Sequence, residues 1–438
     1  MSSPRSDPSI LIIGGGTWGI STALALSRRG FSRITVLDAH PVPSPISAGN
    51  DVNKIMEEGA PSPENTDEEY VWNRLHQIAS KAWHEDPVFA PYYHETGIVY
   101  AACSPEVWEH VKGWTVGREG QFDLLERKED FRRTMPEGVL TGDFPSWQGF
   151  WKKSGAGWLF ARGALMSAYK EAVRLGVKFT AGLPHGEVEA LLYRNSTDSQ
   201  PDVTGARTAD GFEHMADWII LSAGANADVF FDFENQLRPT AWTLAHMPLT
   251  VEEYTLYKDL PVLFNAERGF FIEPDAEKHE LKLCDEHPGY LNMVREHEGE
   301  EERSRPFARH QIPEDSERRI RTLLQDTMPH LAERAFSFAR ICWDADTVDR
   351  QFLIDRHPRY KSLIVAAGGS GMGFMMMPAV GKVVADTLEG VLEPRLREGF
   401  RWRPEQAVHR DWQNTQDRYG ADGKVMDFRD VKEWTHVG

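Results

Sequence analysis

The 438-residue sequence predicts an α/β fold of two domains, one on a parallel sheet and one on a larger mixed or antiparallel sheet. Three observations support this prediction. A strand, glycine turn, helix and second strand follow one another over residues 9–38, and a strand, glycine run and helix recur over residues 362–390. Alternating apolar runs fill the region 232–330. Because the glycine patterns stand near opposite ends of the chain, we expect both ends to meet at one ligand.

The first pattern has the residue types of a dinucleotide-binding turn. Residues 9–13 read as a short apolar strand, and Gly14, Gly16 and Gly19 follow in G-x-G-x-x-G spacing. Gly14 permits a tight turn, Gly16 lets the backbone approach a pyrophosphate, and Gly19 lets helix and strand pack closely. The helix predicted over residues 17–29 then offers its N-terminus to the anion.

Asp38 ends the second strand of this pattern, predicted over residues 34–37. At this spacing its carboxylate can accept hydrogen bonds from a ribose 2′-hydroxyl, and its charge would repel a 2′-phosphate. The alternative, a merely structural glycine turn, leaves Asp38 without a role. The motif alone does not distinguish FAD from NAD.

Composition excludes several other classes of protein. Charged residues make up 26% and hydrophobic residues 41%, as in ordinary globular proteins. The net charge of −18 argues against a nucleic-acid or anionic-membrane surface. No run of about 18 apolar residues predicts a membrane span. Three cysteines make no disulfide framework, the N-terminus is not a signal peptide and the C-terminus is not an SKL-type signal, so we expect a cytoplasmic protein.

The segment 40–59, after Asp38, is rich in proline and glycine, and we expect an extended loop there rather than a helix or strand. Its small polar residues could wrap a cofactor, and Lys54 lies near its end; the alternative for Lys54 is an ordinary solvated lysine. We expect an exposed loop over 57–69, a helix over 70–84 and a strand over 92–100.

The middle of the chain alternates between the two predicted domains. Residues 155–179 read as a loop, a helix and a strand that rejoins the first sheet, and residues 186–222 read as a β-meander. The runs 240–247, 269–274 and 280–286 read as strands of the larger sheet. We expect a solvated loop over 296–305 and a helix over 316–327.

The second glycine pattern begins with a strand at 363–365 and ends with a helix over 378–388. Between them stand Gly368, Gly369, Gly371 and Gly373, a second glycine-rich helix entrance. The methionines at 375–377 are more often core residues than a site. We expect a helix and a tail in the last thirty residues.

In combination, these features resemble the flavin-dependent amine oxidases that include D-amino-acid oxidase and monomeric sarcosine oxidase, and within them the fungal fructosyl amino acid oxidases, or Amadoriases. The resemblance extends over nearly the whole chain. It rests on the blocks GGGTWG (14–19), AGNDVNK (48–54), SGAGW (154–158), LRPTAWTL (237–244), GFFIEPD (269–275), CDEHPGY (284–290), FARICWDADT (338–347), FLIDRHP (352–358) and VMDF (425–428).

The resemblance implies a Rossmann-type FAD-binding domain and a substrate-binding domain, an α+β two-domain organisation. We assign residues 1–60, 150–230 and 331–438 to the former, and residues 61–149 and 231–330 to the latter. The cofactor-binding residues expected from the motifs are Gly14, Gly16, Thr17, Trp18, Gly19, Asp38, Ser47, Asn50, Lys54, Cys342, Asp344, Gly371, Gly373, Phe374 and Met375.

The resemblance also implies that FAD is attached covalently through a cysteine, and the matching position is Cys342. A thiolate can attack the flavin 8α-methyl group, and Arg340, close by in sequence, could favour the thiolate. The alternative is an inert buried cysteine.

Two lysines match catalytic positions of the family. Lys282 matches the lysine held near the flavin, where a fixed cation stabilises the negative charge that develops when O₂ takes up electrons. Its alternation with Leu281 and Leu283 puts it on the opposite face of a strand from them. A lysine in that position is usually solvated, so its role rests on the resemblance. Lys54 matches a second active-site lysine.

Glu286 and Arg418 match the family's substrate-binding residues. Glu286 would accept hydrogen bonds from sugar hydroxyls, and Arg418 would hold the amino-acid carboxylate as a planar fork. Taken alone, each would be read as a surface ion. Some relatives have a lysine after the G-x-G-F run that also holds this carboxylate, and here that position is Met375. We therefore expect a preference for sugar on the ε-amine of lysine over sugar on an α-amine.

The resemblance implies a monomeric protein that oxidises a fructosyl amino acid with O₂ to an imine, which water cleaves to the free amino acid and glucosone, with release of hydrogen peroxide. The close alternative is the same chemistry on another secondary amine, such as saccharopine or an N-methyl amino acid. An NAD-dependent dehydrogenase and a catalytically silent flavin-binding module are the alternatives from other classes. We expect no metal, nucleic-acid or membrane partner.

Overall fold

The computed structural model describes residues 7–59, 66–194, 201–295, 298–299, 301–413 and 415–437. A six-stranded sheet carries the first glycine pattern, in the order β22–β23–β13–β1–β2–β9. Every neighbouring pair is parallel except β22 and β23. The strands are β1 (Ile10–Ile13), β2 (Ile34–Asp38), β9 (Lys178–Ala181), β13 (Trp218–Leu221), β22 (Leu353–Arg356) and β23 (Leu363–Ala367).

Both faces of this sheet are covered. In β1, Ile10 and Ile12 pack into the core formed with the helices, whereas Leu11 and Ile13 pack into a second core on the opposite face. This alternation is the period-two pattern of a strand buried on both sides. The helices of the first core are α1 (Thr17–Arg28), α2 (Asp67–Glu85), α5 (Ala161–Arg174), α8 (Met377–Glu389) and α9 (Pro394–Phe400). The antiparallel strands β10 (Val188–Arg194), β11 (Asp202–Thr208) and β12 (Glu213–Met215) flank the second.

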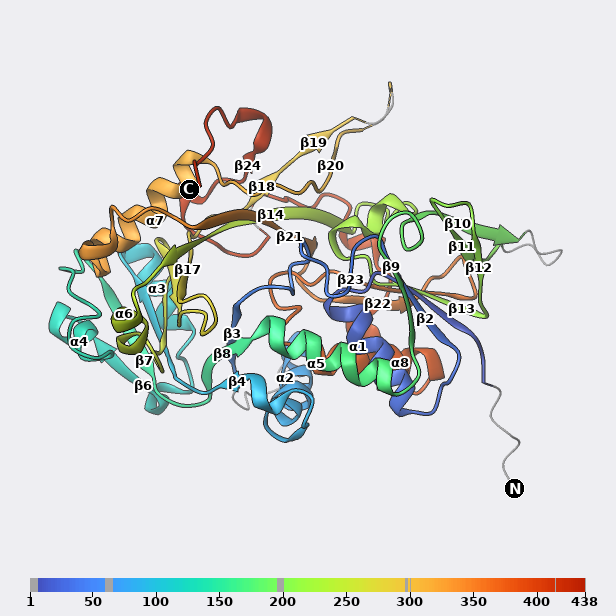
Figure 1. Cartoon of the computed structure of the whole chain (residues 1–438), viewed down its shortest axis with the longest axis horizontal. Coiled ribbons are helices and arrows are strands. Elements are labelled where there is room, and N and C mark those ends of the chain that lie inside the picture. The colour runs from blue at the N-terminus through green and yellow to red at the C-terminus, as the bar shows by residue number, and fades with distance from the viewer. Residues whose placement is uncertain are drawn as a thin grey trace.

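The other half of the molecule is built on a ten-stranded mixed sheet (Figure 1). Strand β14 pairs with β21 over ten residues, from Leu237 opposite Thr347 to His246 opposite Phe338. The strands are β5 (Ile98–Ala102), β6 (Phe122–Leu125), β7 (Gln148–Lys152), β14 (Leu237–Pro248), β15 (Val262–Asn265), β16 (Gly269–Ile272), β17 (Glu280–Cys284), β18 (Tyr290–Leu291), β21 (Phe338–Thr347) and β24 (Met426–Asp427). A parallel sheet beside a larger mixed one confirms the predicted fold class.

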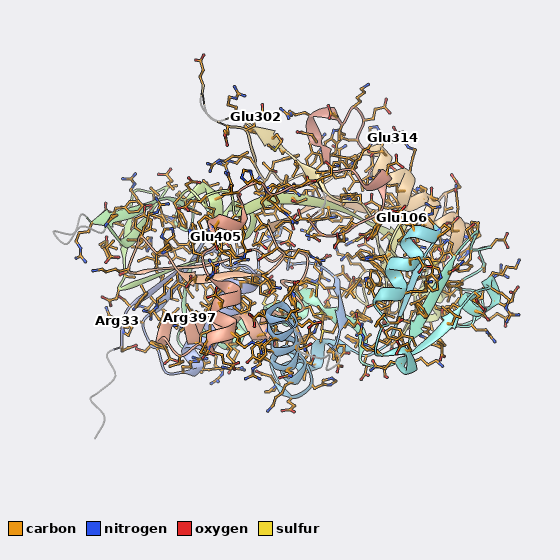
Figure 2. The ribbon with its side chains drawn as sticks, turned by 180° about the vertical axis from the view of Figure 1, so that it is seen from behind. Arg33, Glu106, Glu302, Glu314, Arg397 and Glu405 are labelled. Carbon is orange, nitrogen blue, oxygen red and sulfur yellow. The ribbon has the colours of Figure 1, made fainter. Side chains whose placement is uncertain are left out.

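Helices α3 (Pro105–Gly113), α4 (Lys128–Arg132), α6 (Val251–Leu256) and α7 (Glu314–Thr327) complete this half. A short two-stranded ladder joins β19 (Met293–Val294) to β20 (Arg303–Ser304). Charged side chains such as those of Glu106, Glu302 and Glu405 project from the surface (Figure 2). None of the helices in the described segments is both long and apolar enough for a membrane span.

Several local predictions were wrong, for one physical reason. Residues 53–57, expected in a loop, form strand β3 (Asn53–Glu57), and residues 156–160, also expected in a loop, form β8 (Ala156–Phe160). These strands pair with each other, and β4 (Tyr93–His94) pairs with β8. The strand expected over 92–100 is interrupted at Gly97, which has φ +85°. Pairing between distant segments determined these strands, and a local pattern does not contain that information.

The end of the chain also differs from expectation. Apart from short helical turns and β24, the described residues after Phe400 form no regular helix or strand. Segments 57–69 and 296–305 fall partly outside the described residues. Strand β21 lies in the large sheet although its residues belong to the segment 331–438 assigned to the cofactor domain, so the domain boundaries stay a prediction.

The two glycine patterns are joined through their helices. The Trp18 indole N–H donates to the Gly373 carbonyl at 2.9 Å, and the Ser21 hydroxyl donates to the Met377 carbonyl at 2.5 Å. Helices α1 and α8 therefore begin side by side, as expected from a chain whose two ends meet.

Candidate cofactor and substrate site

In the first glycine turn, Gly14 and Gly19 are tightly packed against other backbone atoms, whereas Gly16 has open space beside it. Gly14 has φ +101°, and a Cβ there would stand 2.4 Å from the Ser222 carbonyl oxygen. A Cβ at Gly19 would stand 1.8 Å from the Gly14 carbonyl oxygen, so both glycines are required by packing. At Gly16, the N-cap of α1, the nearest atom to a Cβ is Ser47 Oγ at 3.7 Å, and no side chain caps the helix. An open helix N-terminus of this kind fits a pyrophosphate.

Asp38 lies beside this turn. Its carboxylate accepts hydrogen bonds from the backbone N–H groups of Gly15 and His40, each at 2.8 Å. Burial raises the pKa of Asp38, and these two hydrogen bonds oppose the rise. A carboxylate has about four lone-pair positions, so Asp38 can still accept hydrogen bonds from a ribose hydroxyl.

A loop formed by residues 44–51 closes over the start of α1. A Cβ at Gly49 would stand 2.0 Å from Thr17 Oγ1 and 3.3 Å from the Phe374 ring, so this loop touches both glycine patterns. The Asn50 amide donates to the Ser44 carbonyl at 3.0 Å, and the Ser47 hydroxyl accepts from the Gly49 N–H at 3.2 Å. The structure thus brings together the predicted cofactor-binding residues of three separate segments.

Asp344 holds the second glycine run in place. Its carboxylate accepts from the N–H of Gly371 at 2.5 Å and from that of Ala345 at 2.8 Å. Burial and the neighbouring Asp346 raise the pKa of Asp344 to about 6. Gly373 is fixed in turn by the Trp18 indole described above.

Two lysines share one buried carboxylate. Lys282 Nζ lies 2.6 Å from Asp51 Oδ2, and Lys54 Nζ lies 2.9 Å from the same oxygen. The Lys282 ammonium also donates to the Asn53 carbonyl at 2.8 Å, and only 2% of its side chain is exposed. Burial alone would raise the pKa of Asp51, but Lys282, Lys54 and Arg340 together hold it well below its usual value. Three cations face one anion here, which is an environment that favours a further negative charge.

Cys342 lies in the middle of β21, opposite Trp242 of β14. Burial lowers the pKa of Lys54, but Asp51 and then Cys342 more than reverse that effect, so the ammonium of Lys54 interacts with the thiol. Arg340, the cation expected to favour the thiolate, instead donates to the carbonyls of Pro45 and Ser47 at 3.1 and 3.4 Å. The cation that interacts with Cys342 is therefore Lys54, an interaction that the sequence did not predict.

A cavity of about 310 Å³ opens beside the second glycine run. Arg418 Nη1 lies 2.8 and 3.0 Å from the two Glu286 carboxylate oxygens, and both residues line the cavity. Burial raises the pKa of Glu286 to about 7, although Arg418 opposes the rise. The remaining lining residues are His110, Trp114, Phe264, Ala266, Arg350, Gly371, Met372, Gln416 and Asp417.

Several residues that line this cavity were not predicted from the sequence. Trp114 and Phe264 stand in segments with no glycine turn and no family block, so nothing local marked them. Arg350 lies between two blocks that were noticed, and its position beside them was the one available signal. Met375 does not line the cavity: its sulfur lies 3.3 Å from the Glu57 backbone nitrogen, and the neighbouring Met372 takes the lining position.

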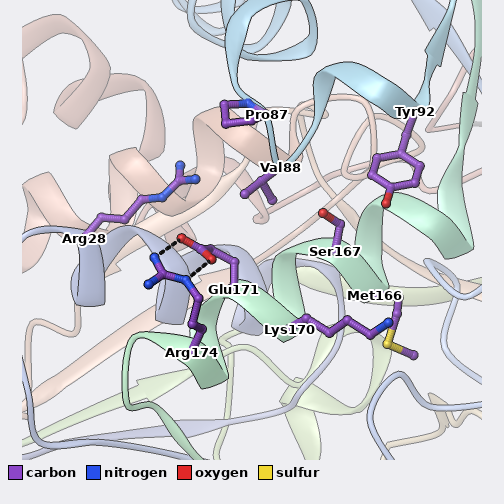
Figure 3. Close-up of a pocket in the computed structure, with 9 residues that line it drawn as sticks. All are labelled: Arg28, Pro87, Val88, Tyr92, Met166, Ser167, Lys170, Glu171 and Arg174. Atoms are coloured by element: carbon purple, nitrogen blue, oxygen red, sulfur yellow. Dashed lines mark hydrogen bonds and ion pairs between the residues drawn. The ribbon is translucent and has the colours of Figure 1, made fainter.

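A second hollow, of about 430 Å³, lies elsewhere on the surface, between α1, α5 and the segment 87–92 (Figure 3). Its acid and its arginines are already paired: Glu171 with Arg174 at 2.6 and 2.7 Å, and Arg28 with Asp86. None of the predicted site residues lines it.

Comparison with known proteins identifies the family. The family model for FAD dependent oxidoreductases matches residues 9–387. Amadoriase I from Aspergillus fumigatus, a fructosyl amine:oxygen oxidoreductase, superimposes with a TM-score of 0.95 at 54% identity, over 100% of both chains. Amadoriase II from the same organism, a fructosamine oxidase, gives a TM-score of 0.94 at 51% identity, over 100% of this chain and 99% of its own.

A more distant relative is the L-saccharopine oxidase of Schizosaccharomyces pombe, 28% identical over 90% of this chain and 93% of its own. The open helix N-terminus at Gly16, the acid at the end of β2 and the excess of buried cations all fit the dinucleotide and flavin of FAD. The chain belongs to the family of FAD dependent oxidoreductases.

Proposed function

We propose that this protein is an FAD-dependent oxidase of fructosyl amino acids, which it converts with O₂ and water to the free amino acid, glucosone and hydrogen peroxide. One observation carries the proposal: a buried carboxylate and an arginine, Glu286 and Arg418, meet at 2.8 Å in a cavity that Gly371 of the second glycine run also lines. The two Aspergillus fumigatus Amadoriases, similar over the whole chain, support the substrate class.

The residues of the cavity have complementary tasks. Glu286 accepts hydrogen bonds from the sugar hydroxyls, since its carboxylate has lone pairs beyond those taken by one Arg418 nitrogen. Arg418 holds the carboxylate of the amino acid with its planar guanidinium, which matches the two carboxylate oxygens. Its guanidinium carbon also lies 5.1 Å above the Trp242 ring, a contact that limits its orientation.

Lys282 and Lys54 supply positive charge on the cofactor side. Because Lys282 is buried and held by Asp51 and the Asn53 carbonyl, its position is fixed before any substrate arrives. A preorganised cation lowers the free energy of negative charge that develops beside it. FAD, when bound, supplies the oxidation of the amine and passes the electrons to O₂.

We also propose that Cys342 attaches the cofactor covalently. Cys342 stands at the position that the family resemblance gives to the attachment cysteine, and it interacts electrostatically with Lys54. Acid precipitation tests the linkage: a yellow pellet is expected, and release of all the flavin into the supernatant would refute it.

The preferred substrate, in this proposal, carries its sugar on the ε-amine of lysine. Met375 stands where some relatives have a lysine, and its sulfur packs against β3 rather than toward the cavity. The site thus lacks one cation close to the reacting amine. A carboxylate on the far end of a lysine side chain depends less on that cation than the carboxylate of an α-glycated amino acid.

The deciding experiment measures hydrogen peroxide release by the purified, yellow protein. Nε-fructosyl-lysine should give the highest kcat/KM, fructosyl-valine a lower one, and sarcosine and saccharopine the lowest. Saccharopine as the best substrate would favour the alternative that the Schizosaccharomyces pombe relative supports. A colourless protein would overturn the proposal. Size-exclusion chromatography should give the mass of a monomer, which we also propose.

A further inference from the structure

Arg350 is a charged residue of the cavity that the resemblance did not assign. It stands in the turn between β21 and β22 with φ +65°, a conformation that non-glycine residues seldom adopt. Its side chain lines the cavity together with Glu286 and Arg418. A strained backbone at a cavity wall motivates a search for what the side chain does there.

The guanidinium of Arg350 has no partner among the described residues. Its Nε is shielded from solvent and makes no hydrogen bond there. Every other candidate acid is engaged or distant: Asp349 binds Arg403 at 2.8 and 2.7 Å, and Glu286 binds Arg418.

Three further acids, Asp346, Asp417 and the exposed Glu68, affect Arg350 without a hydrogen bond to it among the described residues. Asp346 is held by the Gln416 amide at 2.5 Å, and Asp417 is exposed to solvent at the edge of the cavity. Burial and then Arg418 lower the pKa of Arg350, while Asp417, Asp346 and Glu68 oppose that change. A guanidinium remains charged under such conditions, so the cavity wall contains a cation whose shielded Nε has no acceptor among the described residues.

A buried donor without an acceptor destabilises the protein, and a ligand that supplies the acceptor removes that cost. A carboxylate is the anion that matches a guanidinium with two parallel hydrogen bonds. Trp114, Phe264 and Met372 add an apolar wall to the same cavity, suited to a methylene chain between the sugar-bearing amine and the carboxylate.

We propose that Arg350 is a specificity-determining residue, which binds the α-carboxylate of Nε-fructosyl-lysine together with Arg418, while Glu286 engages the sugar. This inference rests on the proposed function and deepens it. Methionine at position 375 cannot bind the substrate carboxylate as the lysine of some relatives does. Arg350 binds it instead, so recognition of the carboxylate depends on the turn between β21 and β22.

The test compares two substrates that differ only in charge, Nε-fructosyl-lysine and its carboxamide, in the flavin-loaded enzyme. Anaerobic rapid mixing measures the apparent Kd and the limiting rate of flavin reduction separately. In Arg350→Gln, the Kd of the acid should rise about ten- to hundredfold, the range for a lost charge-assisted hydrogen bond, with its limiting rate nearly unchanged. The carboxamide should bind the variant and the unaltered enzyme about equally.

Two further variants complete the design. Arg350→Lys keeps the positive charge but cannot make two parallel hydrogen bonds to a carboxylate, so it should retain part of the preference for the acid. If Arg350→Gln does not fold, the same comparison of Kd values is made with Arg350→Lys. Arg33→Gln, an exposed arginine labelled in Figure 2, is the matched control and should change neither Kd.

The outcomes separate the two proposals. If the unaltered enzyme oxidises neither substrate, the proposed function fails. If it oxidises both and Arg350→Gln weakens the acid and the carboxamide equally, or weakens neither, the role of Arg350 is wrong while the proposed function stands. A loss confined to the acid supports both.

Discussion

Replacing Lys282 by methionine tests the buried cluster around Asp51 most directly. The change removes an ammonium that lies 2.6 Å from Asp51 Oδ2 and 2.8 Å from the Asn53 carbonyl, in a side chain that is 2% exposed. Asp51 keeps Lys54 at 2.9 Å, so its charge is not left entirely unpaired. Methionine has a similar length, so the packing of β17 changes little.

The loss of stability can be estimated from these contacts. Removing one partner of a buried ion pair costs about 3–5 kcal/mol, and the remaining Lys54 puts Lys282→Met at the lower end, about 3 kcal/mol. An unfolding entropy of about 2.1 cal/mol/K per residue gives about 0.9 kcal/mol/K for this chain length. The expected decrease in Tm is therefore about 3 °C.

A double-mutant cycle separates the pair from its surroundings. Lys54→Met alone should also destabilise the protein, and the double variant should lose more than the sum of the single losses because Asp51 then has neither lysine. Lys153→Met is the control: Lys153 is 58% exposed in its pair with Asp123, so its effect should stay within about 0.5 kcal/mol.

The same variant tests the catalytic proposal. Reoxidation of the reduced flavin by O₂, followed at the flavin absorbance, should slow about 100-fold in Lys282→Met, as when one preorganised donor is removed from a site of developing charge. Lys153→Met should reoxidise at the normal rate. An unchanged Tm together with unslowed reoxidation in Lys282→Met would refute the reasoning about both burial and charge.

Three further predictions concern single side chains. Cys342→Ser should release its FAD on acid precipitation, and a pellet that stays yellow would exclude this thiol as the attachment point. Since burial raises the pKa of Glu286 to about 7, its carboxylate forms only as pH rises through that value; kcat/KM should therefore increase from pH 6 to 8, and Glu286→Gln should lose this increase for the same substrate. An identical profile in both enzymes would contradict that assignment. Met375→Lys should raise kcat/KM for fructosyl-valine relative to Nε-fructosyl-lysine by about tenfold if an added cation there is worth a single charge-assisted hydrogen bond, and a constant ratio would count against the role given to this position.

Elements with a strong local signal could be predicted from the sequence. The strand and helix around Gly14, and the helix after Gly373, have glycine spacing and apolar periodicity that identify them without knowledge of the rest of the chain. Strands β3 and β8 could not be predicted in this way. Their residues become a ladder only because the two segments pair with each other, and no turn connects them in sequence.

The candidate site followed the same division. Lys282 alternates with leucines as a solvated lysine would, and its burial depends on Asp51, which lies far away in the chain. The electrostatic interaction of Lys54 with Cys342 likewise joins segments that only the fold brings together. Residue types and family blocks identified the individual positions, but the sequence contained no signal for their pairing.

The pairing of α1 with α8 has a consequence for how the protein is made. Helix α1 leaves the ribosome early, yet the residues that receive its Trp18 and Ser21 hydrogen bonds, Gly373 and Met377, are translated near the end. At about 5–20 residues per second, roughly 20–70 s separate the synthesis of the two helices. During that interval the apolar side of the nascent parallel sheet lacks one of its covering helices, so this half of the molecule completes its folding only after nearly the whole chain has been translated.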